Sequence, residues 1–266
     1  MAAPNLPEAA SPSEAPYLSV VVPAYNEADR LPRTLARLQE YYAGQTYTFE
    51  VIVVSDGSRD ETVRIAREFA DRDARFSVID SVPNHGKGYV VRRGVLESRG
   101  EFVLFCDADL ATPQEETEKL LPYLAEGFDV IIGSRPLRDS KLEVRQPLWR
   151  EALGRLSNQL IQILAVRGIA DTQCGFKLFR RAVAQDVFGR CKLNGFSFDF
   201  EALMIARDLG YRIQEVPIRW MHQEGSKVVI WRDYPRTFRD LVLLRLRGKS
   251  ARLRPGPGIH PRESAP

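Results

Sequence analysis

The sequence predicts an α/β fold in which helices flank a mostly parallel sheet. From residue 17 to about residue 133, short apolar runs rich in β-branched residues alternate with stretches whose leucines and valines recur at helical spacing. Strands separated by helices of this length form βαβ units with right-handed crossovers. A second observation is that acidic residues follow an apolar run directly, as Asp107 and Asp109 follow residues 102–106. Open α/β sheets bind their ligands at this end of the strands.

Each apolar run in the first half predicts a buried strand, and each periodic stretch predicts the helix that leads to the next strand. Two of these helices begin with a capping-box pattern: Ser58 with Glu61, and Thr112 with Glu115. Pro113 is suited to the first position of the second helix. The expected strands are 18–22, 51–54, 76–79, 102–106 and 130–132, and the expected helices lie around 31–38, 58–69, 91–95 and 112–124.

The second half is less regular, but it carries one long helical pattern. Leucines recur on one face of a helix expected from residue 147 to about residue 166. No internal repeat is visible, so the chain is expected to form a single domain with a helical extension. The remaining expected elements are strands at 174–179 and 211–217 and helices at 199–209 and 233–247.

Composition excludes several classes of protein. The 266 residues are 44% hydrophobic and 27% charged, as in a soluble globular protein, and a net charge of +3 gives no reason to expect a nucleic-acid partner. The scattered Cys106, Cys174 and Cys191 favour reduced thiols in the cytoplasm. Charges interrupt every apolar stretch well short of the roughly 20 residues of a membrane span. The first sixteen residues lack the basic start and apolar centre of a signal peptide.

Asp107 and Asp109 are the first candidates for chemistry. Two carboxylates one residue apart at the end of a buried strand repel each other unless a cation joins them. Proteins hold Mg²⁺ or Mn²⁺ with one or two carboxylates and the phosphates of a substrate, which fits this position. The alternative is a pair of solvated loop acids. The sequence has no Gly-x-Gly-x-x-Gly and no Walker loop, which argues against a dinucleotide oxidoreductase and a P-loop NTPase.

Two further loops are expected at the same edge of the sheet, at residues 23–27 and 55–60. Tyr25 could pack against a base, and Asp56 could accept the imide N–H of a base such as uracil. Lys87, in a glycine-flanked loop, is the nearest cation for phosphates. The alternatives are ordinary strand-to-helix turns and a solvent-exposed turn lysine.

Together these motifs resemble the inverting glycosyltransferases of family 2, which have the GT-A fold. The second half resembles the polyprenyl-phosphate (dolichyl-phosphate) sugar synthases, a subgroup that includes glucosyltransferases and mannosyl synthases. The closest resemblance is to the glucosyltransferases, which move a hexose from a nucleotide sugar to a lipid phosphate. The resemblance covers roughly residues 18–229, and its motifs are 23–27, 56–58, 84–88, 107–109, 133–135, 171–179, 198–201 and 225–227.

The resemblance implies roles by position. Asp107 and Asp109 would hold the metal and the diphosphate, and Arg135 and Lys227 would face phosphates of the donor or acceptor. Asp199, with Glu201 near it, falls where many members carry an acidic residue beside the acceptor. The catalytic set is therefore expected to be Asp199, Lys227 and Arg135. The donor-binding residues are expected to be Pro23, Ala24, Tyr25, Glu27, Val54, Asp56, Lys87, Asp107, Ala108 and Asp109.

The acceptor decides which groups the reaction needs. A phosphate acceptor is already anionic at neutral pH, so it needs cations to desolvate and aim it. A sugar hydroxyl would have to lose a proton, and Asp199 would then be the candidate base. Alternatively, Asp199 is only the N-cap of the next helix, and the arginines of the long helix are only its solvated face. The expected acceptor-binding residues are Arg145, Arg150, Ser226 and Lys227, with Arg155 as a further cation.

The resemblance also suggests how the chain is organised. Residues 17–135 would form the nucleotide-sugar-binding half and residues 136–250 the acceptor-binding half of one GT-A domain, between loose tails at 1–16 and 251–266. A basic segment at 236–254 has interleaved apolar residues. It either lies on the anionic cytoplasmic face of a membrane or packs its apolar side on the core, and core packing is slightly favoured.

Two classes of function remain open. The first is a metal-dependent hexosyltransferase that acts on a lipid phosphate or on a soluble acceptor. The second is a non-catalytic nucleotide-sugar-binding protein, which the intact Asp107/Asp109 pair with Lys87 and Lys227 disfavours. A nucleotidyltransferase is a weaker alternative still, because such enzymes usually begin with a glycine-rich basic loop, which this sequence lacks. Glucose rather than mannose, and UDP rather than GDP, are favoured by the subgroup resemblance alone.

Overall fold

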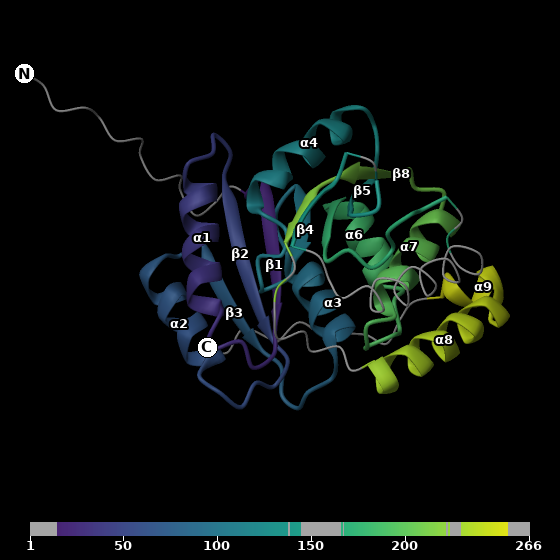
Figure 1. The fold of residues 1–266 in the computed structure, drawn as a ribbon, viewed down its shortest axis with the longest axis horizontal. Coiled ribbons are helices and arrows are strands. Elements are labelled where there is room, and N and C mark those ends of the chain that lie inside the picture. The colour runs from purple at the N-terminus through teal and green to yellow at the C-terminus, as the bar shows by residue number, and fades with distance from the viewer. Residues whose placement is uncertain are drawn as a thin grey trace, which may run out of the picture.

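A seven-stranded mixed sheet forms the centre of the computed structural model, which describes residues 15–137, 139–144, 166, 168–221, 223 and 230–254. The strand order is β3-β2-β1-β4-β7-β5-β8 (Figure 1). Strand β7 is antiparallel to both of its neighbours, and the other adjacent pairs are parallel. The strands are β1 (Leu18–Ala24), β2 (Phe49–Ser55), β3 (Phe76–Asp80), β4 (Phe102–Cys106), β5 (Val130–Ser134), β7 (Phe176–Arg180) and β8 (Ile213–Pro217).

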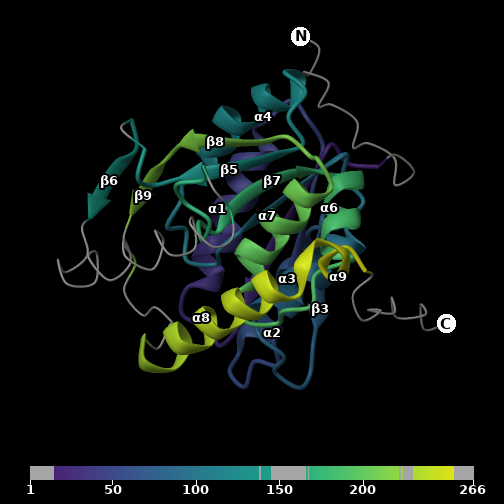
Figure 2. The same cartoon turned by 90° about the vertical axis from the view of Figure 1, so that its right-hand side faces the viewer.

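Helices cover both faces of this sheet and enclose two apolar cores. Helices α1, α2 and α4 pack on one face, whereas α3, α6, α7 and α8 pack on the other (Figure 2). A short parallel pair, β6 (Lys141–Val144) and β9 (Arg219–Met221), stands apart from the main sheet. The helices are α1 (Leu31–Ala43), α2 (Thr62–Arg72), α3 (Lys87–Glu97), the 3₁₀ turn η1 (Gln114–Glu116), α4 (Thr117–Ala125), α6 (Arg181–Phe188), α7 (Phe198–Asp208), α8 (Ile230–Leu246) and α9 (Gly248–Arg252).

The predicted α/β class is confirmed, and every strand expected in the first half is present. The expected helix at 147–166 lies outside the described residues except for its last position, as do most of the two expected tails. Both capping-box predictions are wrong. Helix α2 begins at Thr62 with no side-chain cap, because the Ser58 hydroxyl instead accepts the Asn26 N–H at 3.1 Å. Extended backbone at Pro113 leads into η1, so α4 begins only at Thr117.

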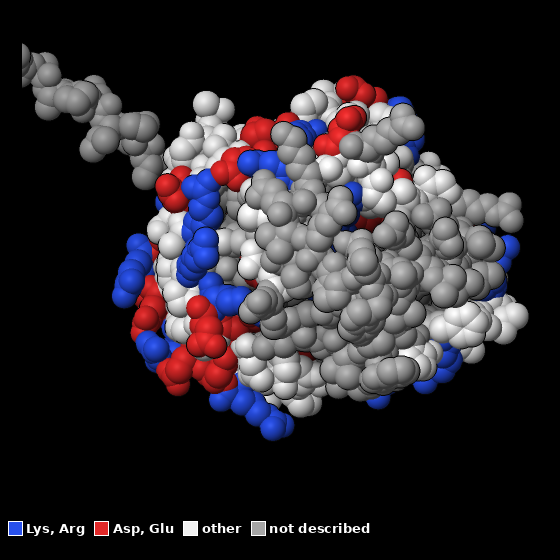
Figure 3. All heavy atoms as spheres, in the orientation of Figure 1, with Lys and Arg blue, Asp and Glu red and all other residues white. Residues whose placement is uncertain are grey.

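An ion pair just past the end of α2 links this helix to α1 and to the start of β3. The left flank in Figure 3, where α1 and α2 lie in Figure 1, shows charges of both signs. The Asp73 carboxylate accepts from Arg75 Nη2 at 2.7 Å and from Gln39 Nε2 at 2.8 Å. The hydrogen bonds from Arg75 lower the pKa of Asp73 to about 2, from an ordinary value of 3.8. A carboxylate with a depressed pKa stabilises the fold above its ordinary pKa, and this contribution is lost as the pH falls through the folded-state value.

We therefore expect Asp73→Asn to lower the free energy of unfolding by about 1–2 kcal/mol at pH 7. The difference from wild type should shrink below pH 4 and vanish near pH 2. Urea unfolding at a series of pH values measures this difference in the free energy of unfolding. Asp71→Asn, at an exposed position in α2, is the control. A difference that persists unchanged at pH 2 would show that Asp73 acts through its shape rather than its charge.

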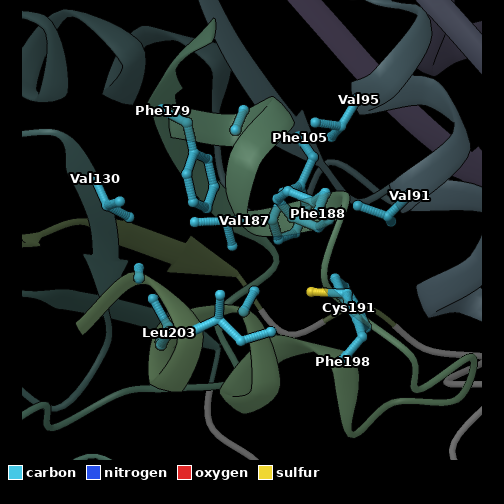
Figure 4. Close-up of a cluster of buried hydrophobic side chains, with 14 of the residues drawn as sticks. Val91, Val95, Phe105, Val130, Phe179, Val187, Phe188, Cys191, Phe198 and Leu203 are labelled. Carbon is cyan, nitrogen blue, oxygen red and sulfur yellow. The ribbon is translucent and has the colours of Figure 1, made fainter. Parts of the chain in front are cut away.

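An aromatic cluster packs around Phe105, the second-to-last residue of β4 (Figure 4). The ring centres of Phe105 and Phe198 are 5.7 Å apart, and those of Phe179 and Phe188 are 5.5 Å apart. All four are buried. Because Phe105 is only two residues before Asp107, close packing of this cluster fixes the strand end that carries the acidic pair.

Candidate active site

The topology brings the predicted site residues to one edge of the sheet. The parallel strands β1, β2, β4 and β5 end there, and the antiparallel strand β7 begins there. The Asp107 N–H, just past β4, donates to the carbonyl of Gly175, just before β7, at 3.2 Å. The insertion of β7 between β4 and β5 therefore places a glycine directly against the acidic pair.

Asp107 and Asp109 lie side by side with a lysine and a glycine packed around them. The Lys87 Nζ, at the start of α3, lies 2.6 Å from Asp107 Oδ1. A Cβ on Gly175 would lie 2.1 Å from Asp107 Oδ2, so only glycine leaves room for this carboxylate. The Asp109 Oδ1 accepts the Ala111 N–H at 3.0 Å. Burial and the charge of Asp107 raise the pKa of Asp109.

This carboxylate pair fits a hard divalent cation. Asp107 and Asp109 are both partly exposed, and burial together with the charge of Asp107 raises the pKa of Asp109. Carboxylate oxygens of this kind are the ligands that Mg²⁺ and Mn²⁺ take. Among the described residues, no group of three or more acidic, histidine or cysteine side chains surrounds a possible metal position. In proteins, Mg²⁺ is often held by only one or two carboxylates together with substrate phosphates and water.

A buried ion pair lies behind Lys87. Lys177, in the middle of β7, is fully buried and bonds both the Asp199 carboxylate on α7 and, at 2.6 Å, the carbonyl of Cys174. Burial raises the pKa of Asp199, against the opposing charges of Lys177 and Lys87. Burial also opposes the charge of Lys87, but Asp107 and Asp199 outweigh it and raise the pKa of the lysine. Acidic and basic groups thus alternate from the strand end into the core.

Arg135, at the end of β5, is fixed by a bidentate ion pair. Its Nε and Nη2 bond the two carboxylate oxygens of Asp171 at 2.7 and 2.9 Å. Asp171 is itself buried, and Glu215 on β8 accepts its backbone N–H at 2.9 Å. The guanidinium lies 5.5 Å from the ring centre of Trp220. Burial opposes the charge of Arg135, but Asp171 outweighs it and raises the pKa of the arginine. The charge is therefore held in one place at this edge.

The loop after β1 presents one exposed aromatic ring at the same edge. Tyr25 is 36% exposed, and the next residue, Asn26, has a φ of 50°. The Glu27 N–H donates to the Thr62 hydroxyl at 2.8 Å, and the Glu27 carboxylate pairs with Arg30. The loop is thus tied to the start of α2, and the Tyr25 ring is partly exposed; its stacking on a base stays a prediction.

Asp56 holds a neighbouring loop. Its carboxylate accepts the backbone N–H of His85 at 2.7 Å and of Gly86 at 2.9 Å, and the Asn84 amide at 2.8 Å. An ionised carboxylate accepts about four hydrogen bonds, so a position remains for the imide of a base, and that contact stays a prediction. In this structure the carboxylate fixes the loop that leads to Lys87.

Some residues that were predicted to bind the donor have buried side chains. Val54 is fully buried in the core against α3, so its side chain has no surface to offer a donor. The side chains of Pro23, Ala24 and Ala108 are also buried. The Ala108 carbonyl accepts the Thr34 hydroxyl at 2.6 Å, which ties the acidic loop to α1.

The acceptor side is described only in part. Arg145, Arg150, Arg155, Ser226 and Lys227 lie outside the described residues, so their roles stay predictions. Glu201 accepts the backbone N–H groups of Lys192 and Leu193 at 3.0 and 2.8 Å, and only 2% of it is exposed. Its carboxylate is thus used to hold a loop. The N-cap alternative for Asp199 is wrong, because Ser197 precedes α7 and Asp199 pairs with Lys177.

Sequence reasoning missed the roles of Lys177, Asp171 and Gly175. A signal was present for the first, because a lysine inside the apolar run Phe176–Phe179 requires a buried anionic partner. The closeness of Gly175 to Asp107 had no local signal, since it depends on where β7 enters the sheet.

Comparison with known proteins identifies the family. Residues 19–188 match glycosyl transferase family 2. The chain belongs to this family. It is 38% identical to a dolichyl-phosphate beta-glucosyltransferase of Trichomonas vaginalis, over 80% of this chain and 68% of the relative. It is 39% identical to the dolichyl-phosphate beta-glucosyltransferase of Drosophila melanogaster, over 86% of this chain and 74% of the relative. The predicted family and subgroup resemblance are therefore confirmed.

A solved structure from Mycobacterium tuberculosis shares the fold of this family 2 chain. It is glucosyl-3-phosphoglycerate synthase, which was crystallised with Mn²⁺, UDP and glucosyl-3-phosphoglycerate. The TM-score is 0.63 at 21% identity, and the match covers 86% of this chain and 80% of the synthase. The likeness supports the predicted GT-A architecture.

Proposed function

We propose that this protein transfers glucose from UDP-glucose to a polyprenyl phosphate such as dolichyl phosphate, with inversion at the sugar. The observation that carries the proposal is the acidic pair Asp107 and Asp109 at the carboxyl edge of the sheet, with Lys87 against it and Arg135 fixed nearby. The names of the relatives indicate the sugar and the acceptor, and the ligands of the mycobacterial synthase support UDP.

Tyr25 and Lys87 are proposed to bind the donor, and the proposed reaction runs from the donor to the acceptor phosphate. Tyr25 would stack on the base, and Lys87 would place positive charge beside the diphosphate. A phosphate oxygen of the acceptor attacks the anomeric carbon, the bond from that carbon to the diphosphate oxygen breaks, and UDP leaves with the electron pair. Mg²⁺ or Mn²⁺ held by Asp107 and Asp109 would stabilise the charge on the leaving group.

A phosphate acceptor removes the need for a general base. Asp199 is 4% exposed and paired with Lys177, which suits a group that holds charge in place rather than one that collects a proton from an acceptor. The Arg135 guanidinium, held by Asp171, would aim a phosphate without having to be ordered first. Lys227, Ser226, Arg145 and Arg150 remain the proposed further contacts with acceptor phosphate.

The proposed acceptor is a lipid, so the protein must reach a membrane surface, which we place at the cytoplasmic face. The described residues contain no helix that is both long and apolar enough to cross a bilayer. The basic segment 236–254 is the candidate for a peripheral contact.

UDP release measured with Mg²⁺ or Mn²⁺ and UDP-glucose, with and without a short polyprenyl phosphate, tests the proposal. We expect lipid-dependent release, which Asp109→Asn should lower by about 10²-fold or more because metal-ion stabilisation amounts to several kcal/mol. Asp71→Asn, at an exposed position on α2, is the matched control. UDP release that does not depend on the lipid would indicate hydrolysis of the donor by water, with a soluble acceptor still to be found. Binding of UDP without any release would favour a non-catalytic binding protein.

A further inference from the structure

Helix α8 presents two apolar faces, and within the part of the chain that the structure describes one of them is buried and the other exposed. Leu241 and Leu244 are 1% and 2% exposed and belong to the buried core that also contains residues of α7. This confirms the core-packing alternative for these two residues. Phe238 and Leu246 are instead 51% and 76% exposed, with the half-buried Val242 between them. The spacing i, i+4, i+8 aligns these three residues in a second stripe.

Basic side chains flank this second stripe. Arg239 and Arg245 lie on either side of it by helical position, and Arg236 and Arg247 are also exposed. The sequence from 236 to 249 has one acid, Asp240, whose side chain is 14% exposed. Its carboxylate accepts from the Ser197 hydroxyl at 2.9 Å and from Arg239 at 3.1 Å. Leu243, on the same helix, is also exposed, at 41%. We call Phe238, Val242, Leu243 and Leu246 with Arg236, Arg239 and Arg245 the outer face of α8.

The outer face belongs to an element fixed close to the candidate site. Ser197, which bonds Asp240, directly precedes α7 and lies two residues before Asp199. In Figure 3 the lower right flank, where α8 lies in Figure 1, shows basic side chains among uncharged ones. A surface that bound the outer face would therefore lie close to the buried ion pair of Lys177 and Asp199.

We propose that the outer face of α8 docks the protein on a membrane surface that contains anionic lipids. An exposed stripe of Phe, Val and Leu bordered by arginines can bury its apolar side chains among acyl chains while the guanidinium groups meet the lipid phosphates. A second copy of the chain would instead set arginines against arginines, which disfavours self-association here. The inference deepens the proposed function, since it names the surface from which a lipid phosphate would be reached.

Vesicle sedimentation tests the docking surface without donor or acceptor. We expect binding to phosphatidylcholine vesicles that contain phosphatidylglycerol, and little binding to phosphatidylcholine alone. Binding should weaken at high salt, because surface charges are screened. Phe238→Asp with Leu246→Asp, and separately Arg239→Glu with Arg245→Glu, should each lower the partition coefficient by at least about tenfold. Val82→Asp is the control, since Val82 is 72% exposed on a separate loop.

Three results would overturn the docking surface: no binding to anionic vesicles, equal binding to both vesicle types, or wild-type binding by both double variants. A concentration-dependent dimer that the aspartate variant abolishes, without vesicle binding, would assign the face to self-association. Transfer to a short polyprenyl phosphate dissolved without vesicles separates the two proposals. The double variant Phe238→Asp with Leu246→Asp should keep the wild-type rate with this dissolved acceptor. A wild-type protein that binds vesicles but transfers no glucose would refute only the proposed function.

Discussion

Gly175→Ala is expected to lower the rate of glucose transfer by about 10²-fold or more while the protein stays folded. The new Cβ would lie within 2.1–2.7 Å of all three terminal atoms of the Asp107 side chain. This carboxylate would have to turn away, which breaks its contact with Lys87 and misplaces a proposed metal ligand. Misplacement of a catalytic group by about 1 Å can cost roughly 10²-fold in rate.

The control for this variant is Gly195→Ala. Nothing lies within 4 Å of a Cβ at Gly195, so alanine there should leave transfer unchanged. Binding of Mn²⁺ in the presence of UDP, followed by electron paramagnetic resonance, should weaken in Gly175→Ala and not in the control. Wild-type transfer and wild-type Mn²⁺ affinity in Gly175→Ala would show that Asp107 is not a ligand whose position matters.

The fold class and the position of the acidic pair could be predicted because both depend on local patterns. Strand β4 is a continuous apolar run, and parallel strands end at one edge, so the location of Asp107 followed from the chain alone. The capping box at Ser58 failed because Ser58 has a tertiary partner 32 residues away. The one at Thr112 failed because the backbone at Pro113 is extended and α4 begins only at Thr117.

The pairings behind the site could not be predicted, because they depend on topology. Lys177 meets Asp199 only because β7 inserts antiparallel between β4 and β5 and faces α7. Base binding by Asp56 stays a prediction, but the hydrogen bonds from the loop at residues 84–86 to its carboxylate, across about 30 residues of sequence, were not predicted. A carboxylate at the end of a strand predicts that some donor will hydrogen-bond to it, but the sequence does not say which donor that is.

Lys177→Met is expected to be strongly destabilising. Lys177 is 0% exposed and Asp199 is 4% exposed, so removal of the lysine leaves a buried carboxylate without its main partner. Breaking a buried ion pair in this way typically costs about 3–5 kcal/mol. The variant also loses the bond from Lys177 to the Cys174 carbonyl, beside Gly175. Urea unfolding monitored by circular dichroism measures the change in the free energy of unfolding.

A second substitution separates the pair from the rest of the site. Lys177→Met combined with Asp199→Leu should recover most of the lost stability, because apolar residues of similar volume often replace a buried ion pair without net cost. Transfer should nevertheless stay impaired, since the Asp199 carboxylate helps to hold the charge of Lys87 beside the acidic pair. Lys249→Met, at an exposed position on α9, should change stability by less than about 0.5 kcal/mol. If Lys177→Met alone cost no more than this control, the alternating charges behind the site would be hydrated rather than buried, and the assignment of Asp199 as a fixed internal anion would be wrong.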